Sequence, residues 1–325
     1  MDQPVKIKED VYWIGSLDPG LVVFDIVIPT KHGTTYNAYL VRGEKIAVIE
    51  TVKSYCVDDF ISKIRSLVRP EDIDYIIINH TEPDHSGGLI RLMELAPKAI
   101  PVFSRGARTF VKNILHKEFD YMEVKAGDSI DLGGKVLKFI SAPFLHWPDT
   151  MFTYLETDKI LFPCDAFGSH YCSDKRFNDE LDSKEDAFTA YEFYYDTILR
   201  PFKKYVIDAL DNIKDTDIEI IAPSHGPILR ENIKKYIDSY REWAGKTKKY
   251  PDKKKIVIIY VSSYGSTKRM AESIYRGACL PDADVSLLDA AEIDMDSLLD
   301  EIDAADGIIL GTPTLNAKAP KPIFD

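Results

Sequence analysis

Short apolar runs of strand length follow one another along the first two-thirds of the chain. Between two of them, residues Cys56–Val68 repeat apolar positions at three- and four-residue intervals, which predicts an amphipathic helix. The predicted strands are Val11–Ile14, Asn37–Val41, Ile46–Glu50, Tyr75–Ile78, Ala99–Phe103, Tyr121–Val124, Val136–Ile140, Met151–Leu155, Lys159–Phe162 and Ile218–Ile221. Longer helical patterns cover Ala187–Arg200 and Pro201–Asn212. Strands combined with helices, with polar residues at strand ends, indicate a layered α/β domain.

A second pattern begins after a lysine-rich segment. Residues 244–255 contain Gly, Pro and several lysines, and we interpret them as a linker between a domain of residues 1–243 and a domain of residues 256–325. Ile256–Val261 is a continuous apolar run, typical of a strand buried in a parallel sheet. The elements predicted after it are helix Lys268–Cys279, strand Asp284–Leu288, helix Asp294–Ala304 and strand Gly307–Leu310. This βαβαβ order predicts a parallel sheet.

Charge and cysteine content narrow the class of protein. The formal net charge is −12 over 325 residues, and an acidic surface repels phosphate backbones, so we expect no nucleic-acid partner. No apolar run reaches the ~20 residues of a membrane span, and the N-terminus has no signal pattern, so we expect a cytoplasmic protein without membrane contact. The four cysteines are scattered, which indicates neither a disulfide framework nor a cysteine-held iron module. Electrons, where needed, would come from another protein.

A dense group of ionisable side chains follows the run Tyr75–Ile78. Within Asn79–Gly88 it comprises His80, Glu82, Asp84 and His85. Carboxylates this close repel one another unless a cation neutralises them. Three further candidates each come just after a predicted strand: His146, Asp165 and His225. Singly, each is more often a capping or surface residue, but together with the group they complete a two-metal set. The other histidines, His32, His116 and His170, are interpreted as ordinary residues.

The order H-x-E-x-D-H, an isolated His, an Asp, and a His before Gly resembles the metal signature of the metallo-β-lactamase superfamily in its flavodiiron version. The flanking segments Gly33–Leu40, Leu145–Met151 and Asp165–Gly168 are similar as well. The resemblance implies a metallo-β-lactamase-like αββα sandwich with two iron ions. In it, His80, Glu82 and His146 would hold one iron, Asp84, His85 and His225 would surround the other, and Asp165 would bridge them. In some relatives water takes the place of His85.

Glu82 separates two interpretations of this site. Hydrolytic zinc members of the superfamily usually have His at that position, and a carboxylate favours iron. The alternatives are a dinuclear zinc hydrolase, in which a metal-bound hydroxide attacks an ester or amide, and a non-catalytic redox or scaffold module. Asp25 departs from the family pattern, because some relatives have His near that position.

Two loops of the second domain resemble those of flavodoxins. Ser262–Thr267 joins a strand to a helix N-terminus, where hydroxyls and free N–H groups suit a phosphate. Gly311–Asn316 is similar to the loop beside the isoalloxazine ring. The candidate FMN contacts are Ser262, Tyr264, Gly265, Ser266, Thr267, Thr312, Pro313, Thr314 and Asn316. Only three of the five strands of a flavodoxin-like doubly wound sheet are predicted, so we interpret this domain as incomplete and the chain as shortened. We expect it to bind FMN weakly or not at all.

The resemblance also implies the reaction. A flavodiiron protein reduces dioxygen to water or nitric oxide to nitrous oxide at its di-iron site, with electrons passed through FMN. Rubredoxin or another reduced carrier would supply those electrons, and the chain would form a head-to-tail homodimer or a dimer of dimers. The sequence leaves the choice between the two substrates open.

Overall fold

The computed structural model describes residues 3–115, 119–245, 253–315 and 317–324. The chain forms two compact units, Met1–Gly245 and Lys246–Asp325, and each is described by itself. Among the described residues, no helix combines the length and the apolar character that a membrane crossing requires.

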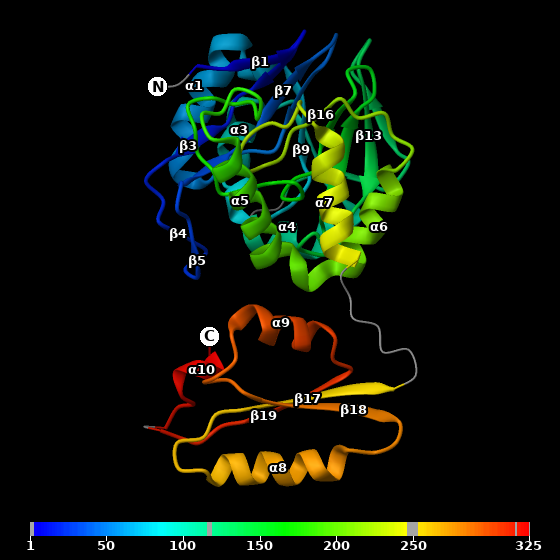
Figure 1. The fold of residues 1–325 in the computed structure, drawn as a ribbon. Helices are drawn as coiled ribbons and strands as arrows, with labels where there is room; N and C mark the ends of the chain where they lie inside the picture. Colours follow the sequence, from blue (N-terminus) through cyan, green and yellow to red (C-terminus); the bar gives the residue numbers. More distant parts are fainter. Residues whose placement is uncertain (1–2, 116–118, 246–252, 316, 325) are drawn as a thin grey trace. The chain divides into compact units, whose positions relative to one another are not determined.

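The first unit contains two sheets that pack face to face, with helices on both outer sides (Figure 1). The seven-stranded sheet has the order β1 (Val5–Lys8), β2 (Val11–Trp13), β7 (Tyr39–Arg42), β8 (Ile46–Ile49), β9 (Ile73–Ile78), β10 (Ile100–Ser104) and β11 (Met122–Val124). The five-stranded sheet has the order β12 (Ser129–Asp131), β13 (Val136–Ser141), β14 (Met151–Leu155), β15 (Ile160–Phe162) and β16 (Ile220–Ile221). Two small ladders pair β3 (Ser16–Asp18) with β6 (Thr34–Tyr36) and β4 (Val23–Phe24) with β5 (Ile28–Pro29).

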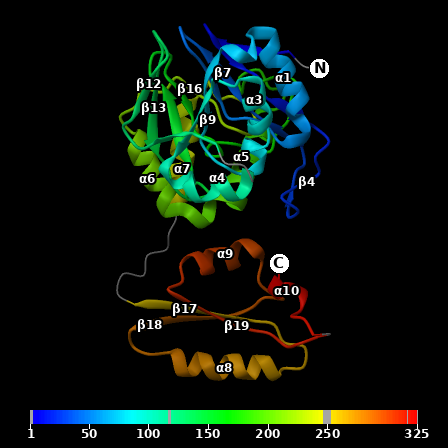
Figure 2. The ribbon, with the colours of Figure 1, turned by 180° about the vertical axis from the view of Figure 1, so that it is seen from behind.

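The helices cover the two outer faces, as the views from both sides show (Figure 2). On the seven-stranded sheet lie α1 (Val57–Leu67), α3 (Leu89–Leu95) and α4 (Arg108–Leu115). On the five-stranded sheet lie α5 (Lys184–Tyr194), the π-helical turn Tyr195–Leu199, α6 (Lys203–Ile213) and α7 (Ile233–Gly245). This arrangement is the predicted αββα sandwich.

Central strands are apolar on both faces because both faces are covered. In β7, Tyr39 and Val41 point into the core between the sheets, whereas Leu40 points to the helix layer. In β9, Ile77 faces the core between the two sheets, and Ile78 faces the helix layer. This double burial explains why these segments read as continuous apolar runs rather than as alternating patterns.

Asn79, the residue after β9, links the two sheets. Its side-chain nitrogen donates to the carbonyl of Phe162 at 3.2 Å, and its side-chain oxygen accepts from the hydroxyl of Thr153 at 2.7 Å. Its own carbonyl accepts from the backbone N–H of Met151 at 3.0 Å. The end of β9 is therefore held against the five-stranded sheet.

The second unit is a three-stranded parallel sheet between two helices. Its order is β18 (Ala283–Asp289), β17 (Lys254–Tyr260) and β19 (Gly307–Gly311). Helix α8 (Ser266–Ala278) packs on one face and α9 (Met295–Asp303) on the other (Figure 1). Helix α10 (Lys321–Phe324) lies in the tail. Of the predicted linker, residues 246–252 lie outside the described residues, while α7 continues to Gly245 and β17 begins at Lys254.

Candidate metal centre

The seven candidate ligands all lie just beyond strand ends. His80 follows β9, and Glu82 precedes the single helical turn α2 (Pro83–Ser86), which carries Asp84 and His85. Pro83 occupies the first helical position, where its fixed backbone angle favours the start of a helical turn. From the other sheet, His146 follows β13, Asp165 follows β15 and His225 follows β16.

The loop that carries His225 is held in place by Asn37, which lies between β6 and β7. The side-chain amide of Asn37 donates to the carbonyls of Pro223 and Gly226 at 2.8 and 2.9 Å. Gly226 has a φ of +79°, and a Cβ at this position would overlap Ser169. Only glycine fits such a turn without strain, which explains why the histidine is followed by glycine.

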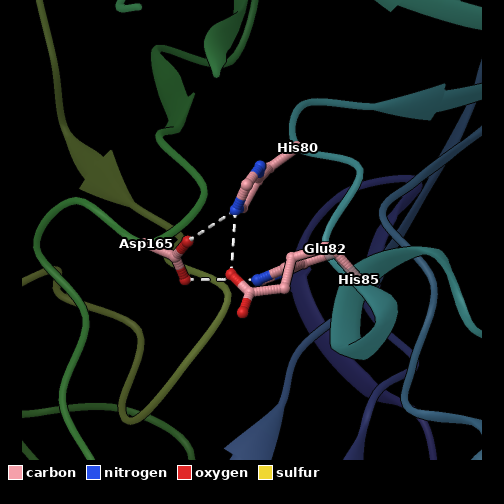
Figure 3. Close-up of side chains that lie close together, drawn as sticks. All are labelled: His80, Glu82, His85 and Asp165. Carbon is pink, nitrogen blue, oxygen red and sulfur yellow. Dashed lines mark hydrogen bonds and ion pairs between the residues drawn. The ribbon is translucent and has the colours of Figure 1, made fainter. Parts of the chain in front are cut away.

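The first group of donors surrounds Glu82. Its Oε2 atom lies 3.0 Å from His80 Nε2 and 3.1 Å from His146 Nε2. Asp165 Oδ2 approaches the same two nitrogens, at 3.7 and 3.8 Å. Figure 3 shows Asp165 facing His80, Glu82 and His85 from the opposite side of the site.

The second group surrounds Asp84. Its two carboxylate oxygens lie 3.3 Å from His85 Nε2 and 3.1 Å from His225 Nε2. Asp165 Oδ1 lies 3.2 and 3.4 Å from these same nitrogens. The two oxygens of Asp165 therefore divide between the two groups.

Unsatisfied buried atoms test whether these residues fit metal ions. Both side-chain oxygens of Asp84 and the Nε2 atoms of His85 and His225 are buried and have no hydrogen-bond partner among the described residues. Buried polar groups normally have one. Oxygen and imidazole donors in two groups that share a carboxylate suit two divalent cations. The side chains of His146 and Glu82 are 23% and 14% exposed, so the first group lies nearer to solvent.

Asp149 and Thr35, both outside the predicted set, contact the Nδ1 atoms of two candidate ligands. Asp149 Oδ1 lies 3.2 Å from His80 Nδ1, while its Oδ2 accepts from the N–H and the hydroxyl of Thr81 at 2.7 Å. His225 Nδ1 donates to the carbonyl of Thr35 at 2.6 Å. Such contacts fix the tautomer, so that Nε2 is left to bind a metal.

Tyr194, at the end of α5, contacts the shared carboxylate. Its hydroxyl donates to Asp165 Oδ1 at 3.0 Å. Burial and the charge of Asp165 hold the pKa of Tyr194 well above its usual range, so the phenol remains a hydrogen-bond donor. The π-helical turn that begins at the next residue belongs to a class of irregularity that is frequent at functional sites.

His170 lies closer to the site than its sequence context indicated. Its ring centroid is 5.5 Å from that of His225 and 4.8 Å from that of Tyr194, and its Nδ1 lies 2.9 Å from the Thr34 hydroxyl. Burial, reinforced by the neighbouring His225, lowers the pKa of His170 to about 3, so it is neutral. His116 lies outside the described residues.

Asp25, which departs from the family pattern, lies near the carboxylates of Glu82 and Asp84. It occupies the turn between β4 and β5. Desolvation and the nearby carboxylates of Glu82 and Asp84 raise the pKa of Asp25 to about 6. The site therefore has an additional carboxyl group on its Glu82 side.

The acidic surroundings retain protons on three candidate ligands. Burial opposes the charge on His80, but its contacts with Asp149 and Glu82 outweigh burial and raise its pKa well above the usual range. Burial lowers the pKa of His85, but Asp84 and Asp165 outweigh it and raise this pKa to about 9. Burial also opposes the charge on His225, yet Asp165 and Asp84 raise its pKa to about 10. A metal ion binds only the deprotonated imidazole, so it must displace these protons.

We therefore expect metal loading at pH 7 to release about three protons per chain, one each from His80, His85 and His225. Calorimetric titration with Co²⁺ in buffers of different ionisation enthalpy measures this number, and the His32→Gln variant serves as a control. The apparent metal affinity should rise as the pH is raised towards 9–10. The metal-free chain should show the opposite trend, because a raised histidine pKa stabilises the fold below about pH 6.5 and this stabilisation is lost as the pH rises through 9–10. Heats that do not depend on the buffer would contradict this account.

The two candidate flavin loops lie next to each other. Gly265, with a φ of +78°, precedes the N-terminus of α8, and the hydroxyl of Ser262 is buried without a partner among the described residues. A Cβ on Gly311 would lie 3.3 Å from the side chain of Thr267, so the loop after β19 begins beside the first loop. A helix N-terminus with an unpaired hydroxyl suits a phosphate group. Asn316 lies outside the described residues.

The fold and the site together define a class: an αββα metallo-β-lactamase-like domain with a two-metal donor set, followed by a flavodoxin-like domain. Family models match accordingly, "ODP family beta lactamase" over residues 34–226 and "Flavodoxin" over residues 258–321. A flavo-diiron protein of Clostridium acetobutylicum is 43% identical over 99% of this chain and 81% of its own length. The chain belongs to the flavodiiron protein family.

Two further relatives differ in the reactions that their names state. A protein of Moorella thermoacetica named nitric oxide reductase is 37% identical over 97% of this chain and 79% of its own length. The structure of rubredoxin oxygen:oxidoreductase from Desulfovibrio gigas has a TM-score of 0.76 at 29% identity, and the match covers 99% of this chain and 80% of that one. The resemblance and the fold class expected from the sequence are thus confirmed, and the chain is a flavodiiron oxidoreductase.

Proposed function

We propose that this chain reduces dioxygen, nitric oxide or both at two iron ions, with electrons that arrive through FMN. The division of the Asp165 oxygens between two donor groups carries the proposal, because a bridging carboxylate has this geometry. The names of the two relatives described above support this pair of substrates.

The ligand assignment follows the two groups. His80, Glu82 and His146 would hold the first iron, and the Nε2 atoms of both histidines lie near Asp165 Oδ2. The second iron would be held by Asp84, His85 and His225, with donors near Asp165 Oδ1. When bound, the two ferrous ions and a reduced flavin supply the electrons for the reaction.

The protein's own residues supply position and environment. The second group is nearly fully buried, whereas Glu82 and His146 are partly exposed, so substrate would enter at the rim beside the first group. The Tyr194 hydroxyl retains its proton and donates it to Asp165 in a hydrogen bond, which stabilises the negative charge of that carboxylate.

Metal analysis and turnover test this proposal together. The chain would be expressed with matched iron and zinc supply and purified without oxygen. We expect two iron ions per chain, and consumption of dioxygen or nitric oxide when reduced rubredoxin and FMN are supplied. Two zinc ions together with ester or amide hydrolysis would instead support the zinc hydrolase and overturn the proposal.

For FMN we propose the two adjacent loops as the site, and we expect weak binding by this chain. Among the described residues, β19 is an edge of its sheet, with Ile308 47% and Leu310 61% exposed, so that side of the flavin site has no covering strand. Quenching of FMN fluorescence measures the affinity, with Thr267→Ala to show that the loop is used and Ser273→Ala as a control. Tight, stoichiometric binding, with the second unit as protease-resistant as the first, would contradict this expectation.

We also propose a homodimer and a separate electron carrier such as rubredoxin. The hairpin β4–β5 exposes apolar side chains, with Val22 74%, Ile26 93% and Val27 78% accessible. Contiguous exposed apolar residues are typical of protein contacts. Light scattering on the purified chain would give the oligomeric state.

A further inference from the structure

The buried histidines of the metal centre follow one pattern, and His85 is the one whose Nδ1 has no oxygen at hydrogen-bond distance among the described residues. His80 and His225 direct Nε2 into the site and place Nδ1 against an oxygen, that of Asp149 and that of the Thr35 carbonyl respectively. His85 also directs Nε2 at carboxylates of the site. Its Nδ1 faces away from them, and an acceptor there would complete the pattern.

Two side chains lie near this nitrogen. Glu50 Oε2 is 3.8 Å from His85 Nδ1, and Cys164 Sγ is 3.9 Å from it. A carboxylate is a strong acceptor, whereas a thiol is a weak one. At 3.8 Å these two atoms lie beyond hydrogen-bond distance, and it is the negative charge of Glu50 that favours a proton on Nδ1.

Only one of the two carboxylate oxygens of Glu50 accepts a hydrogen bond from the described residues. It follows β8, is 1% exposed, and has a left-handed backbone with a φ of 61°. Its Oε1 accepts from the backbone N–H of Asn79 at 2.8 Å. Its Oε2 is buried without a hydrogen-bond partner among the described residues. A buried carboxylate oxygen of this kind requires a positive or hydrogen-bonding neighbour, and His85 provides one.

The residue next to Glu50 holds the other end of the same histidine. Both the backbone N–H and the hydroxyl of Thr51 donate to the carbonyl of His85, at 2.9 and 2.5 Å. Adjacent residues of one turn therefore contact the backbone and the ring of His85. The turn after β8 restrains the position and the orientation of this side chain.

We propose that Glu50 is the positioning residue that directs His85 Nε2 to the second metal ion by holding the proton on Nδ1. The proposal rests on the proposed function, since it presumes a metal at the Asp84 group. It extends the ligand assignment by stating what makes His85 a ligand in this chain. Glu50 would act through His85 and touch neither metal nor substrate.

Glu50→Gln tests the proposal with little change of shape. The glutamine oxygen can still accept from Asn79, but its amide group would face Nδ1 as a donor, which favours the tautomer with the proton on Nε2. We expect the affinity for one of two Co²⁺ ions to fall by roughly 10–100-fold, as is typical when the partner of a ligating histidine is changed. The affinity for the other ion should remain unchanged, and so should both affinities in the Cys164→Ala control.

A spectroscopic signature separates positioning from a general structural role. In the Co²⁺-loaded protein, each histidine bound through Nε2 contributes an exchangeable, hyperfine-shifted Nδ1–H signal in the proton NMR spectrum. We expect Glu50→Gln to lose the one signal that His85→Ala also loses, and to retain the others.

Four outcomes would overturn the proposal. These are equal weakening of both sites, unchanged affinities and spectrum, loss of the signal in Cys164→Ala but not in Glu50→Gln, and a third Co²⁺ ion held by Glu50, His85 and Cys164. Failure of the wild-type chain to bind two metal ions would instead count against the proposed function, so the two failures are distinguishable.

Discussion

Asp165→Asn should remove both metal ions, because each oxygen of this carboxylate faces a different donor group. Removing one partner from a buried charged set costs about 3–5 kcal/mol, which corresponds to a roughly 10²–10⁴-fold loss of affinity at each site. Asparagine retains the size of the side chain, so the loss would reflect charge rather than a cavity. Metal content per chain after gel filtration, and oxygen or nitric oxide consumption, measure the effect.

The matched control for this variant is Asp58→Asn, the same change at an exposed position of α1. It should retain both metal ions. If Asp165→Asn loses only one ion, Asp165 is a ligand to a single metal, and the bridging assignment is wrong.

Asp149 should show two separable effects. Its Oδ2 satisfies two donors of Thr81, and its Oδ1 holds the Nδ1 side of His80. Asp149→Ala leaves these buried groups unpaired, and an unsatisfied buried donor costs about 1–3 kcal/mol. We therefore expect a loss of roughly 2–5 kcal/mol in the free energy of unfolding of this variant, together with weak metal binding.

Asp149→Asn should separate the two roles. Its oxygen can still accept from Thr81, so this variant should lose less stability than Asp149→Ala, whereas its amide group faces His80 Nδ1 as a donor. Metal affinity should then fall by roughly 10–100-fold. Denaturant unfolding of the metal-free chain and Co²⁺ titration distinguish the two variants, and equal instability of both would mean that Asp149 acts only through packing.

Strands were predictable where their apolar residues are buried on both faces. Met151–Leu155 was predicted at the observed boundaries, and Ile46–Glu50 within one residue, because both lie inside the sandwich. The hairpin β4–β5 was not predicted, since its strands are two residues long and its apolar residues are largely exposed. Helix α7 was not predicted either, because its charged residues concealed the buried positions Tyr240 and Ala244.

The residues that face the proposed metals could be proposed from the sequence because polar residues at strand ends share one edge of the sheets. Their supporting contacts could not. Tyr194 reaches Asp165 from 29 positions away, and His225 uses a backbone carbonyl 190 positions away. A carbonyl has no signature in the sequence. For Asp149, the sequence offered one indication of a role at the site, because this residue lies within the family-like segment Leu145–Met151.

The contacts of Asn79 across the two sheets have a consequence for how long the metals are retained. Donors of both groups come from both sheets, which Asn79 ties together. Fraying of any single loop would therefore free only part of a donor set, and the remaining ligands would keep the ion until that loop returned. Complete release requires the sheets themselves to separate, which amounts to opening the domain. The dissociation rate of a bound ion should therefore follow the unfolding rate of the sandwich. Each bound ion should in turn slow that unfolding.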